Sequence, residues 1–163
     1  MPKKNTRKTP SDFEHGNGIK SAVDVAIFNK HGQILLGKRL SKAGFGSWGF
    51  PGGHIMLNES IHSAAKRELC EELGKDAIIK ISKKILAVRE NVIPPYFTHH
   101  ITVILAGSYL KGKIIINESE KCEQWKWFDL DKLPHPLFSG ISDALDNFKN
   151  KSSLIISDWY EKK

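Results

Sequence analysis

Short runs of hydrophobic residues, separated by polar turns, set the pattern of this chain. Residues 22–28 are rich in β-branched and aromatic side chains, residues 29–32 are turn-like, and residues 33–36 resume the apolar pattern, so we expect a β-hairpin. A glycine-rich loop follows at residues 43–53. Further strand-like runs are found at residues 85–88, 101–106, 114–116 and 125–128. These runs predict a β-sheet.

Two segments have the periodicity of an amphipathic helix. In the first, an apolar residue recurs at every fourth position: Ile61, Ala65, Leu69 and Leu73. This stripe predicts a helix over residues 60–73 that packs on the sheet, and Gly74 stands where a left-handed cap is usual. A second helix is predicted near residues 140–150 from three apolar residues: Ile141, Leu145 and Phe148. The order of elements indicates an α/β (α+β) domain in which helices cover a largely mixed sheet.

Length and composition limit the classes of protein to consider. A chain of 163 residues is the size of one domain and can bury a core without disulfides or structural metal. Its cysteines, Cys70 and Cys122, are too few for a disulfide framework and lack the spacing of a structural zinc site. No apolar run approaches the roughly 18 residues of a membrane span, and the first residues lack a signal-peptide core. We therefore expect a cytoplasmic protein with no membrane partner.

The chain has a formal net charge of +7, and much of this excess lies near its ends. Residues 1–17 contain several basic side chains without apolar periodicity, which predicts a disordered basic tail before a single domain over residues 18–163. A basic tail could instead contact nucleic acid, but no aromatic residues alternate with its lysines to stack on bases. Nucleic acid is therefore not the expected partner.

An acidic cluster lies on the first predicted helix. Glu68, Glu71 and Glu72 stand at positions i, i+3 and i+4, so their side chains gather on one face, where like charges repel. A solvated surface, partly neutralised by neighbouring basic side chains, would explain them without any function. However, three convergent carboxylates also supply the hard oxygen ligands that Mg²⁺ or Mn²⁺ prefers, and a glycine such as Gly52 can bring a main-chain carbonyl close. We therefore predict a metal site here.

The stretch GGHIMLNESIHSAAKRELCEELG, residues 52–74, resembles the signature box of the Nudix hydrolases. The positions that match, with the spacing of that family, are Gly53, Glu59, Arg67, Glu68, Leu69, Glu71, Glu72 and Gly74. One position departs, because Lys75 stands where the family usually has an aliphatic residue. The resemblance covers about residues 20–148 and is nearest to MutT-like nucleotide-sanitising pyrophosphatases. It implies a Nudix-type α/β/α sandwich, with a mixed β-sheet between helices, and Mg²⁺-dependent hydrolysis of a nucleoside diphosphate linked to a second group.

The resemblance also implies roles for individual residues. Glu68 and Glu72 would be direct metal ligands, Glu71 would bind directly or through water, and the Gly52 carbonyl would be a further ligand. Arg67 would hold the glutamates in place by ion pairing, and Glu59 would support the loop and the start of the helix. Within the box Glu68 is the first choice for the general base, because a carboxylate there could activate water. Outside it, the candidates are two glutamates before Trp125: Glu120 and Glu123.

Substrate contacts are predicted on the strand and loops around this box. Lys38 and Arg39 end the second strand near the glycine-rich loop, where they could meet phosphates, although exposed strand-end charge is an equal alternative. Trp48 and Phe138 are predicted to contact the base, whereas Trp125 and Trp127 point to one side of a strand and suit the core better. Phe45 is a further loop candidate for a base or apolar group, whereas three histidines are less specific: His54, His99 and His100.

The function expected from these features is hydrolysis of a nucleoside triphosphate, or a related nucleoside diphosphate derivative, to a nucleoside monophosphate and pyrophosphate. One alternative is a nucleotide-sugar or dinucleoside-polyphosphate hydrolase, which would use the same metal site with a different second pocket. A different class is a catalytically decayed module that binds nucleotide or RNA; the intact arginine and glutamates of the box argue against it. We expect Mg²⁺, with Mn²⁺ as a substitute, a small nucleotide as substrate, and a monomer or homodimer.

Overall fold

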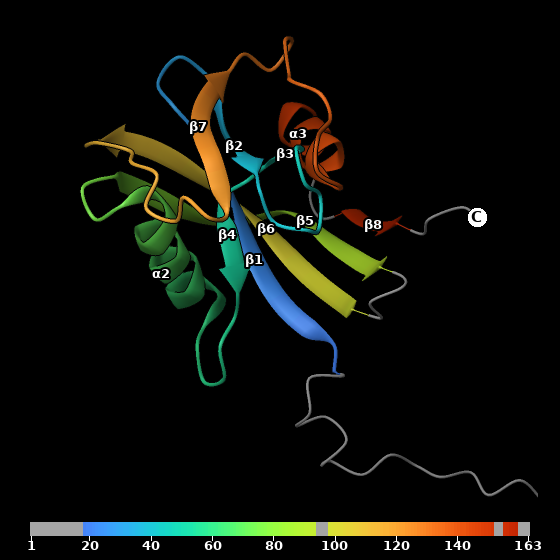
Figure 1. The fold of residues 1–163 in the computed structure, drawn as a ribbon. Helices are drawn as coiled ribbons and strands as arrows, with labels where there is room; N and C mark the ends of the chain where they lie inside the picture. Colours follow the sequence, from blue (N-terminus) through green and yellow to red (C-terminus); the bar gives the residue numbers. More distant parts are fainter. Residues whose placement is uncertain (1–17, 94–97, 152–154, 160–163) are drawn as a thin grey trace, which may run out of the picture.

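The computed structural model describes residues 18–93, 98–151 and 155–159, so the predicted basic tail at residues 1–17 lies outside the described part (Figure 1). The elements, in chain order, are β1 Lys20–Phe28, β2 Ile34–Arg39, β3 Trp48–Gly49, β4 Gly52–His54, α2 Ile61–Leu73, β5 Ile78–Ile93, β6 Thr98–Lys111, β7 Cys122–Phe128, α3 Ile141–Lys149 and β8 Ile155–Trp159. Within these residues, no helix is long and apolar enough to cross a membrane.

The strands form one mixed sheet in the order β3-β2-β1-β6-β5-β8, with β4 also paired to β1 and β7 to β2. Pairings β1–β6 and β5–β8 are parallel, whereas the others are antiparallel. The predicted hairpin is present as β1 and β2, joined at the Phe28–Ile34 pair. β1 is therefore an interior strand, and both of its faces must be covered by apolar packing.

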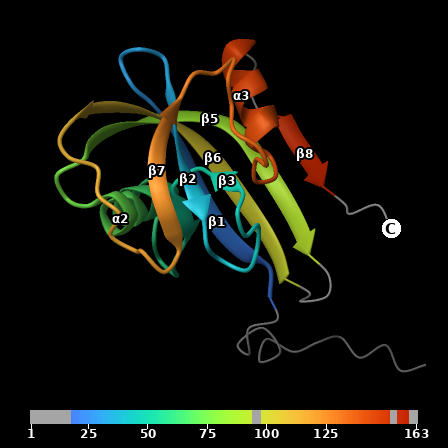
Figure 2. The same cartoon turned by 45° about the horizontal axis from the view of Figure 1, so that its top comes forward.

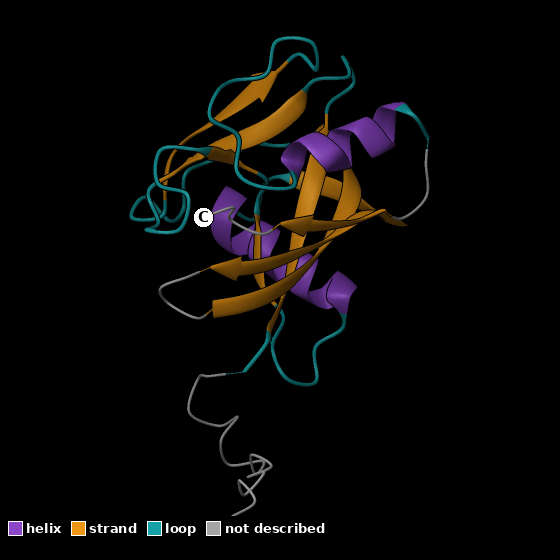
Figure 3. Ribbon diagram, turned by 90° about the vertical axis from the view of Figure 1, so that its right-hand side faces the viewer, coloured by secondary structure: helices purple, strands orange, loops and turns teal. Residues whose placement is uncertain are grey.

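The alternation of side chains along β1 divides the core into two layers. Val23, Val25 and Ile27 face α2, where they pack with the predicted apolar stripe of that helix. Ala26 and Phe28 face the other way and pack with α3. Because successive side chains of a strand point to opposite faces, one strand contributes to both cores. The result is the expected α/β/α sandwich, with the sheet between the two helices (Figures 2 and 3).

Both helices lie where the sequence predicts them. Ser60 begins α2 by accepting a hydrogen bond from the Ser63 N–H (3.1 Å), which satisfies one of the free donors of the first turn. Gly74 ends the helix with φ 87° and ψ 161°, so its φ is positive but it does not adopt the left-handed helical cap expected from the sequence. The glycine is still required, because a Cβ there would lie 2.7 Å from the Ile115 side chain.

The strand predicted at residues 114–116 is wrong. Instead, the segment after β6 folds over the C-terminal end of α2, where the Ile115 N–H donates to the Leu73 carbonyl (3.1 Å). The last carbonyls of a helix lack partners within the helix, so this segment satisfies one of them and leaves the sheet. The run at 85–88 is part of the much longer β5, and β3, β4 and β8 are additional strands.

Candidate active site

Two adjacent glycines let β4 lie directly against the acidic face of α2. A Cβ on Gly52 would stand 2.1 Å from the Val23 carbonyl oxygen, and its φ of 152° also disfavours other residues. A Cβ on Gly53 would stand 2.5 Å from the carboxylate carbon of Glu68. The Gly52 N–H donates to Glu72 Oε2 (2.9 Å). The glycine pair therefore brings backbone into contact with two of the predicted metal ligands.

Arg67 joins the loop before α2 to the glutamates of the helix. Its Nε and Nη2 donate to both carboxylate oxygens of Glu59 (2.9 Å each), and Nη2 also donates to the His54 carbonyl (2.8 Å). Its Nη1 donates to Glu68 (2.7 Å) and Glu71 (3.2 Å). The hydrogen bonds from Arg67 lower the pKa of Glu59, and those with Glu59 and Glu68 raise the pKa of Arg67. A planar guanidinium with five donors can order several carboxylates at once, which a lysine could not do.

Glu72 is the most perturbed carboxylate of the site. Burial raises its pKa to about 8; the Gly52 N–H opposes this rise, and the negative charges of Asp24, Glu118 and Glu68 add to it. Desolvation and like charge both disfavour an ionised carboxylate, so a nearby cation would stabilise the ionised form. The electrostatics of Glu72 thus favour a bound positive ion beside it.

We name the predicted ligands Glu68, Glu71, Glu72 and the Gly52 carbonyl the cradle. Its donors are all oxygens, which suits Mg²⁺ or Mn²⁺ by their preference for hard ligands. Among the described residues, no three His, Cys, Asp or Glu side chains already converge as a ready-formed metal site. This agrees with the hydrogen bonds described above. Glu68 and Glu71 accept from Arg67, whereas Glu72 accepts from the Gly52 N–H. The donor set fits a divalent ion, and binding would require these carboxylates to turn from their present partners.

Glu118 is one residue near the cradle that sequence reasoning missed; Asp24 on β1 is another. Asn117, just before it, donates from its backbone N–H to the Glu72 carbonyl (3.2 Å) and from Nδ2 to the Glu71 carbonyl (2.7 Å). Glu118 itself pairs with Lys121 (2.6 Å), and its charge helps to raise the pKa of Glu72. The preceding segment, which caps α2, thus brings this carboxylate to the cradle.

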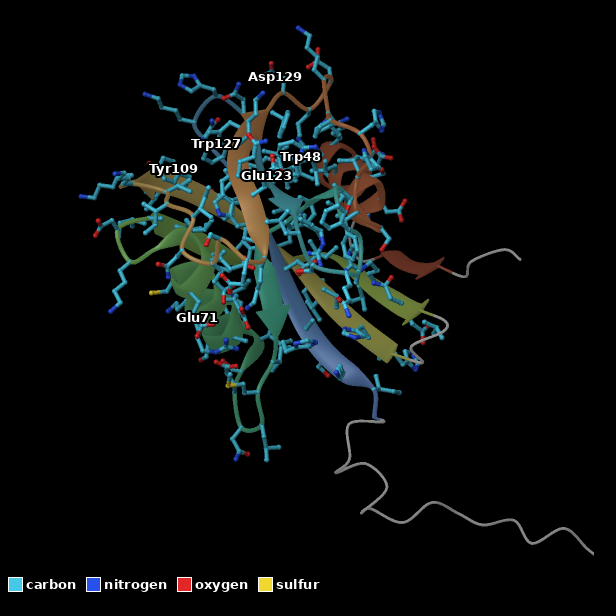
Figure 4. The ribbon with its side chains drawn as sticks, in the orientation of Figure 1. Trp48, Glu71, Tyr109, Glu123, Trp127 and Asp129 are labelled. Atoms are coloured by element: carbon cyan, nitrogen blue, oxygen red, sulfur yellow. The ribbon has the colours of Figure 1, made fainter. Side chains whose placement is uncertain are left out.

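The two glutamates named from the sequence as outside bases are placed differently. Glu123 at the start of β7 pairs with Lys38 near the end of β2 (3.0 Å), and Glu120 is exposed on the loop before β7. Figure 4 labels Glu71 on α2 and Glu123 on β7, two separate elements of the fold. The sequence offers no signal to rank Glu118, Glu120 and Glu123, which lie close together in the chain. Only the contacts of Asn117 single out Glu118.

The predicted substrate residues divide into two groups. Lys38 is neutralised by Glu123, and such an exposed pair contributes at most about 1 kcal/mol. Arg39 is half-buried, and this desolvation lowers its pKa. Its Nε donates to the Ala43 carbonyl (3.2 Å), and its guanidinium carbon lies 4.2 Å from the Phe138 ring centroid. Arg39 and Phe138 therefore lie together beside the glycine-rich loop.

The remaining aromatic residues contribute more to the core than to an open surface. Trp48 is only 9% exposed and packs edge-on against Phe128 with 4.8 Å between ring centroids, which leaves little of its ring for a ligand. Trp125 and Trp127 pack against the α2 side of the core, as predicted. Phe45, in contrast, is 71% exposed.

The three histidines named from the sequence, His54, His99 and His100, lie on strands β4 and β6. The rings of His54 and His100 are 5.3 Å apart, whereas the His99 ring nitrogen contacts the Glu90 carboxylate. His99 and His100 thus have different neighbours, as expected for adjacent residues on a strand. Burial is the main cause of the lowered pKa of His100, and nearby positive charge adds to it.

Comparison with known proteins is consistent with this arrangement. The NUDIX domain model matches residues 18–148. An RNA pyrophosphohydrolase of Wolbachia sp. subsp. Brugia malayi is 32% identical over 132 residues, covering 74% of this chain and 81% of that protein. An oxidized purine nucleoside triphosphate hydrolase of Danio rerio is 32% identical over 112 residues, covering 69% of this chain and 68% of that protein.

Solved structures give the same result. The crystal structure of a MutT NUDIX hydrolase from Burkholderia pseudomallei is 30% identical, with a TM-score of 0.71, and the match covers 80% of this chain and 98% of that one. A MutT protein from Methanosarcina mazei, 23% identical with a TM-score of 0.69 over 82% of this chain and 94% of its own, shares the fold. The resemblance read from residues 52–74 is therefore confirmed, and the chain belongs to the NUDIX family of hydrolases.

Proposed function

We propose that this chain hydrolyses a nucleoside triphosphate to a nucleoside monophosphate and pyrophosphate, or a related nucleoside diphosphate derivative to a nucleoside monophosphate and the phosphate of its second group. The observation that carries the proposal is the cradle, in which Arg67 orders Glu68 and Glu71 while Glu72 is half-buried near other negative charges. Glu68, Glu71, Glu72 and the Gly52 carbonyl would hold Mg²⁺, or Mn²⁺ in its place. The similar proteins named above are an RNA pyrophosphohydrolase, an oxidized purine nucleoside triphosphate hydrolase and two MutT proteins. These names support hydrolysis of a phosphate anhydride bond in a nucleotide.

The chemistry needs both positive charge on the phosphates and activation of water. Bound metal would neutralise phosphate oxygens and lower the pKa of a water ligand. A carboxylate then accepts the proton of the attacking water as its oxygen bonds to phosphorus, and the phosphorus–oxygen bond to pyrophosphate breaks. Glu68 remains the first choice for this base. Glu118 joins two further candidates outside the box, Glu120 on the loop before β7 and Glu123 on β7.

On the substrate side, Arg39 is the better candidate for a phosphate contact than Lys38. Arg39 is partly desolvated, and its hydrogen bond to Ala43 uses only Nε, whereas Lys38 is paired with Glu123. A guanidinium can bind a phosphate through two parallel hydrogen bonds. Phe138, beside Arg39, supplies the apolar surface that we propose for the base.

We propose a cytoplasmic location for the enzyme, as expected from the sequence.

A second candidate is the triphosphate at the 5′ end of an RNA. Curated relatives named RNA pyrophosphohydrolase favour it, and the chain's net charge of +7 would attract a polyanion. The same cradle would serve both substrates, because the bond that breaks is the same. The two proposals differ in whether a nucleotide chain beyond the first base improves turnover.

One set of assays tests these proposals. Purified protein is given the common nucleoside triphosphates, a nucleotide sugar, a dinucleoside polyphosphate and a short RNA with a 5′ triphosphate, with and without Mg²⁺, and the products are identified. We expect pyrophosphate release from a triphosphate that depends on Mg²⁺ or Mn²⁺. A higher kcat/KM on the RNA than on every free nucleotide would favour the second candidate, and binding of nucleotide without turnover would indicate a decayed module.

The cradle is tested by Glu72→Gln, which keeps the shape and removes the charge. We expect the rate to fall at least about 10²-fold, the scale seen when an electrostatic element of a catalytic site is lost. Glu90→Gln is the matched control, because Glu90 is a carboxylate on β5 that contacts His99 rather than the cradle. If Glu72→Gln retains more than half of the wild-type activity at saturating metal, the proposed ligand set is wrong.

A further inference from the structure

Arg89 on β5 is a buried charge outside the cradle that makes an unusual number of contacts. It is only 4% exposed, and burying a charge without partners would be strongly unfavourable. Its Nη2 lies within hydrogen-bond distance of Asp24 on β1 (3.4 Å) and Thr102 on β6 (3.3 Å). Its Nε donates to Asn91 (3.1 Å) when the amide of Asn91 is oriented to satisfy its neighbours. The sheet thus fixes one side of this guanidinium.

The other side of Arg89 contacts three consecutive residues of the segment before α3. Its guanidinium carbon lies 4.9 Å from the Phe138 ring centroid, and its Nη1 donates to the Ser139 carbonyl. Gly140 packs so closely on the Arg89 side chain that a Cβ there would lie 2.6 Å from its Cδ. Arg89 thus contacts the Phe138 ring, the Ser139 carbonyl and the Gly140 backbone, and these three contacts together restrict the position of residues 138–140.

This segment carries the apolar surface that we propose for the substrate base. A Cβ on Gly44 would stand 2.4 Å from the Phe138 ring, so the ring lies directly on the glycine-rich loop, with the Arg39 guanidinium 4.2 Å away. On the other side of the network, Asp24 is the strand partner of Gly52, whose N–H contacts Glu72. Arg89 therefore connects the Phe138 segment to the strand that flanks the cradle.

We propose that Arg89 is a positioning residue that holds Phe138 against the glycine-rich loop and thereby sets substrate affinity. This proposal rests on the proposed nucleotide-hydrolase function. In the described part of the chain, Arg89 bonds to none of the cradle glutamates, so we expect its loss to act through Phe138. Its planar fork is essential, because a lysine would keep the positive charge opposite Asp24 but could not reach Ser139, Thr102 and Asn91 together.

The test uses Arg89→Lys in the full chain, with two readouts. The first is hydrogen exchange of the Phe138 amide, which donates to the Trp48 carbonyl (2.8 Å). We expect its protection to fall at least tenfold, while amides of the β1–β6 pairing keep theirs. The second is steady-state kinetics on the nucleoside triphosphate that the wild-type protein hydrolyses fastest. KM should rise at least fivefold with kcat within threefold of the wild-type value.

A double-mutant cycle with Phe138→Ala separates positioning from a general loss of structure. If Arg89 acts through Phe138, adding Arg89→Lys to Phe138→Ala changes KM by no more than twofold further. Effects that multiply, or unchanged exchange at the Phe138 amide, would overturn the proposal. If Arg89→Lys does not fold, Thr102→Val is used instead, because it removes one hydrogen-bond acceptor of Arg89 with little change of shape. We expect a smaller change in both the amide exchange and KM. No change in either readout overturns the proposal. If the wild-type protein hydrolyses no nucleotide, the proposed function fails, and the exchange measurement still decides whether Arg89 holds the segment.

Discussion

Gly53→Ala offers a sharp test of the cradle, because the structure separates its effect on activity from its effect on folding. The added Cβ would lie 2.5 Å from the carboxylate carbon and 2.5–2.6 Å from both oxygens of Glu68, about 1 Å short of ordinary van der Waals contact. The backbone of Gly53 is not in the left-handed region, and the atoms in the way are the end of a flexible side chain. Glu68 can therefore withdraw without disturbing the sheet.

A withdrawal of about 1 Å is small for folding and large for catalysis. We expect the free energy of unfolding to change by less than about 1 kcal/mol, since alanine also reduces the entropy of the unfolded chain. Displacing a positioned group by about 1 Å can lower a rate on the order of 10²-fold, and we expect kcat to fall by that factor. Thermal unfolding and steady-state kinetics with Mg²⁺ measure the two quantities on the same preparation.

Gly52→Ala is the matched control. There the Cβ would meet the backbone carbonyl of Val23 at 2.1 Å, which cannot turn aside, and we expect destabilisation by about 2 kcal/mol or more. The reasoning is refuted if Gly53→Ala remains folded and keeps more than a third of the wild-type kcat. It is equally refuted if Gly53→Ala unfolds as readily as Gly52→Ala, because the contact would then be structural.

Two further predictions concern stability away from the cradle. Asn147 on α3 is 3% exposed and donates to the Leu86 carbonyl (3.1 Å). Asn147→Ala leaves that acceptor unsatisfied, so we expect the free energy of unfolding, measured with urea, to fall by about 1–3 kcal/mol. No loss would show that another donor replaces Asn147. Burial, with the positive charges of His54, Lys20, Arg89 and His99, lowers the pKa of His100, so the unfolded state binds its proton more readily. Stability from His100 is therefore present above the unfolded pKa of about 6.5 and is lost as the pH falls below it. His100→Asn should flatten the pH dependence of the free energy of unfolding between pH 7.5 and 5.5. An unchanged profile would contradict the lowered pKa of His100.

The sequence predicts best what depends on local pattern. The helix α2 follows from the four-residue spacing of its apolar residues, such as Leu69 and Leu73, which is a property of neighbouring residues. The error at residues 114–116 shows the limit of such patterns, because a β-branched apolar run is equally suited to a strand and to covering another element. Ile114 packs on the α2 side of the core and Ile115 bonds to the end of that helix, and only the tertiary fold distinguishes these outcomes.

The candidate site shows the same division. The spacing of the glutamates on α2 follows from helix geometry alone. The structure places Glu72 against Gly52 and Glu68 against Gly53, and Arg67 links Glu68 to Glu71. Glu118 and Arg89 could not be found in this way, because each acquires its position through partners far away in the chain. Asn117 hydrogen-bonds to the end of α2 and so places the adjacent Glu118 near the cradle. Arg89 is held in the sheet partly by its contact with Asp24 on β1.

The parallel pairing of β1 with β6 has a consequence for how the chain folds as it is synthesised. Lys20 lies opposite His100 and Phe28 opposite Ser108, so the central strand acquires this neighbour only after most of the chain has left the ribosome. Until then the apolar side chains on both faces of β1 have no complete core, and contacts between residues so distant in sequence form slowly. A nascent chain arrested before β6 should therefore expose β1 to chaperones and to aggregation, and protease resistance should appear only once β6 has emerged.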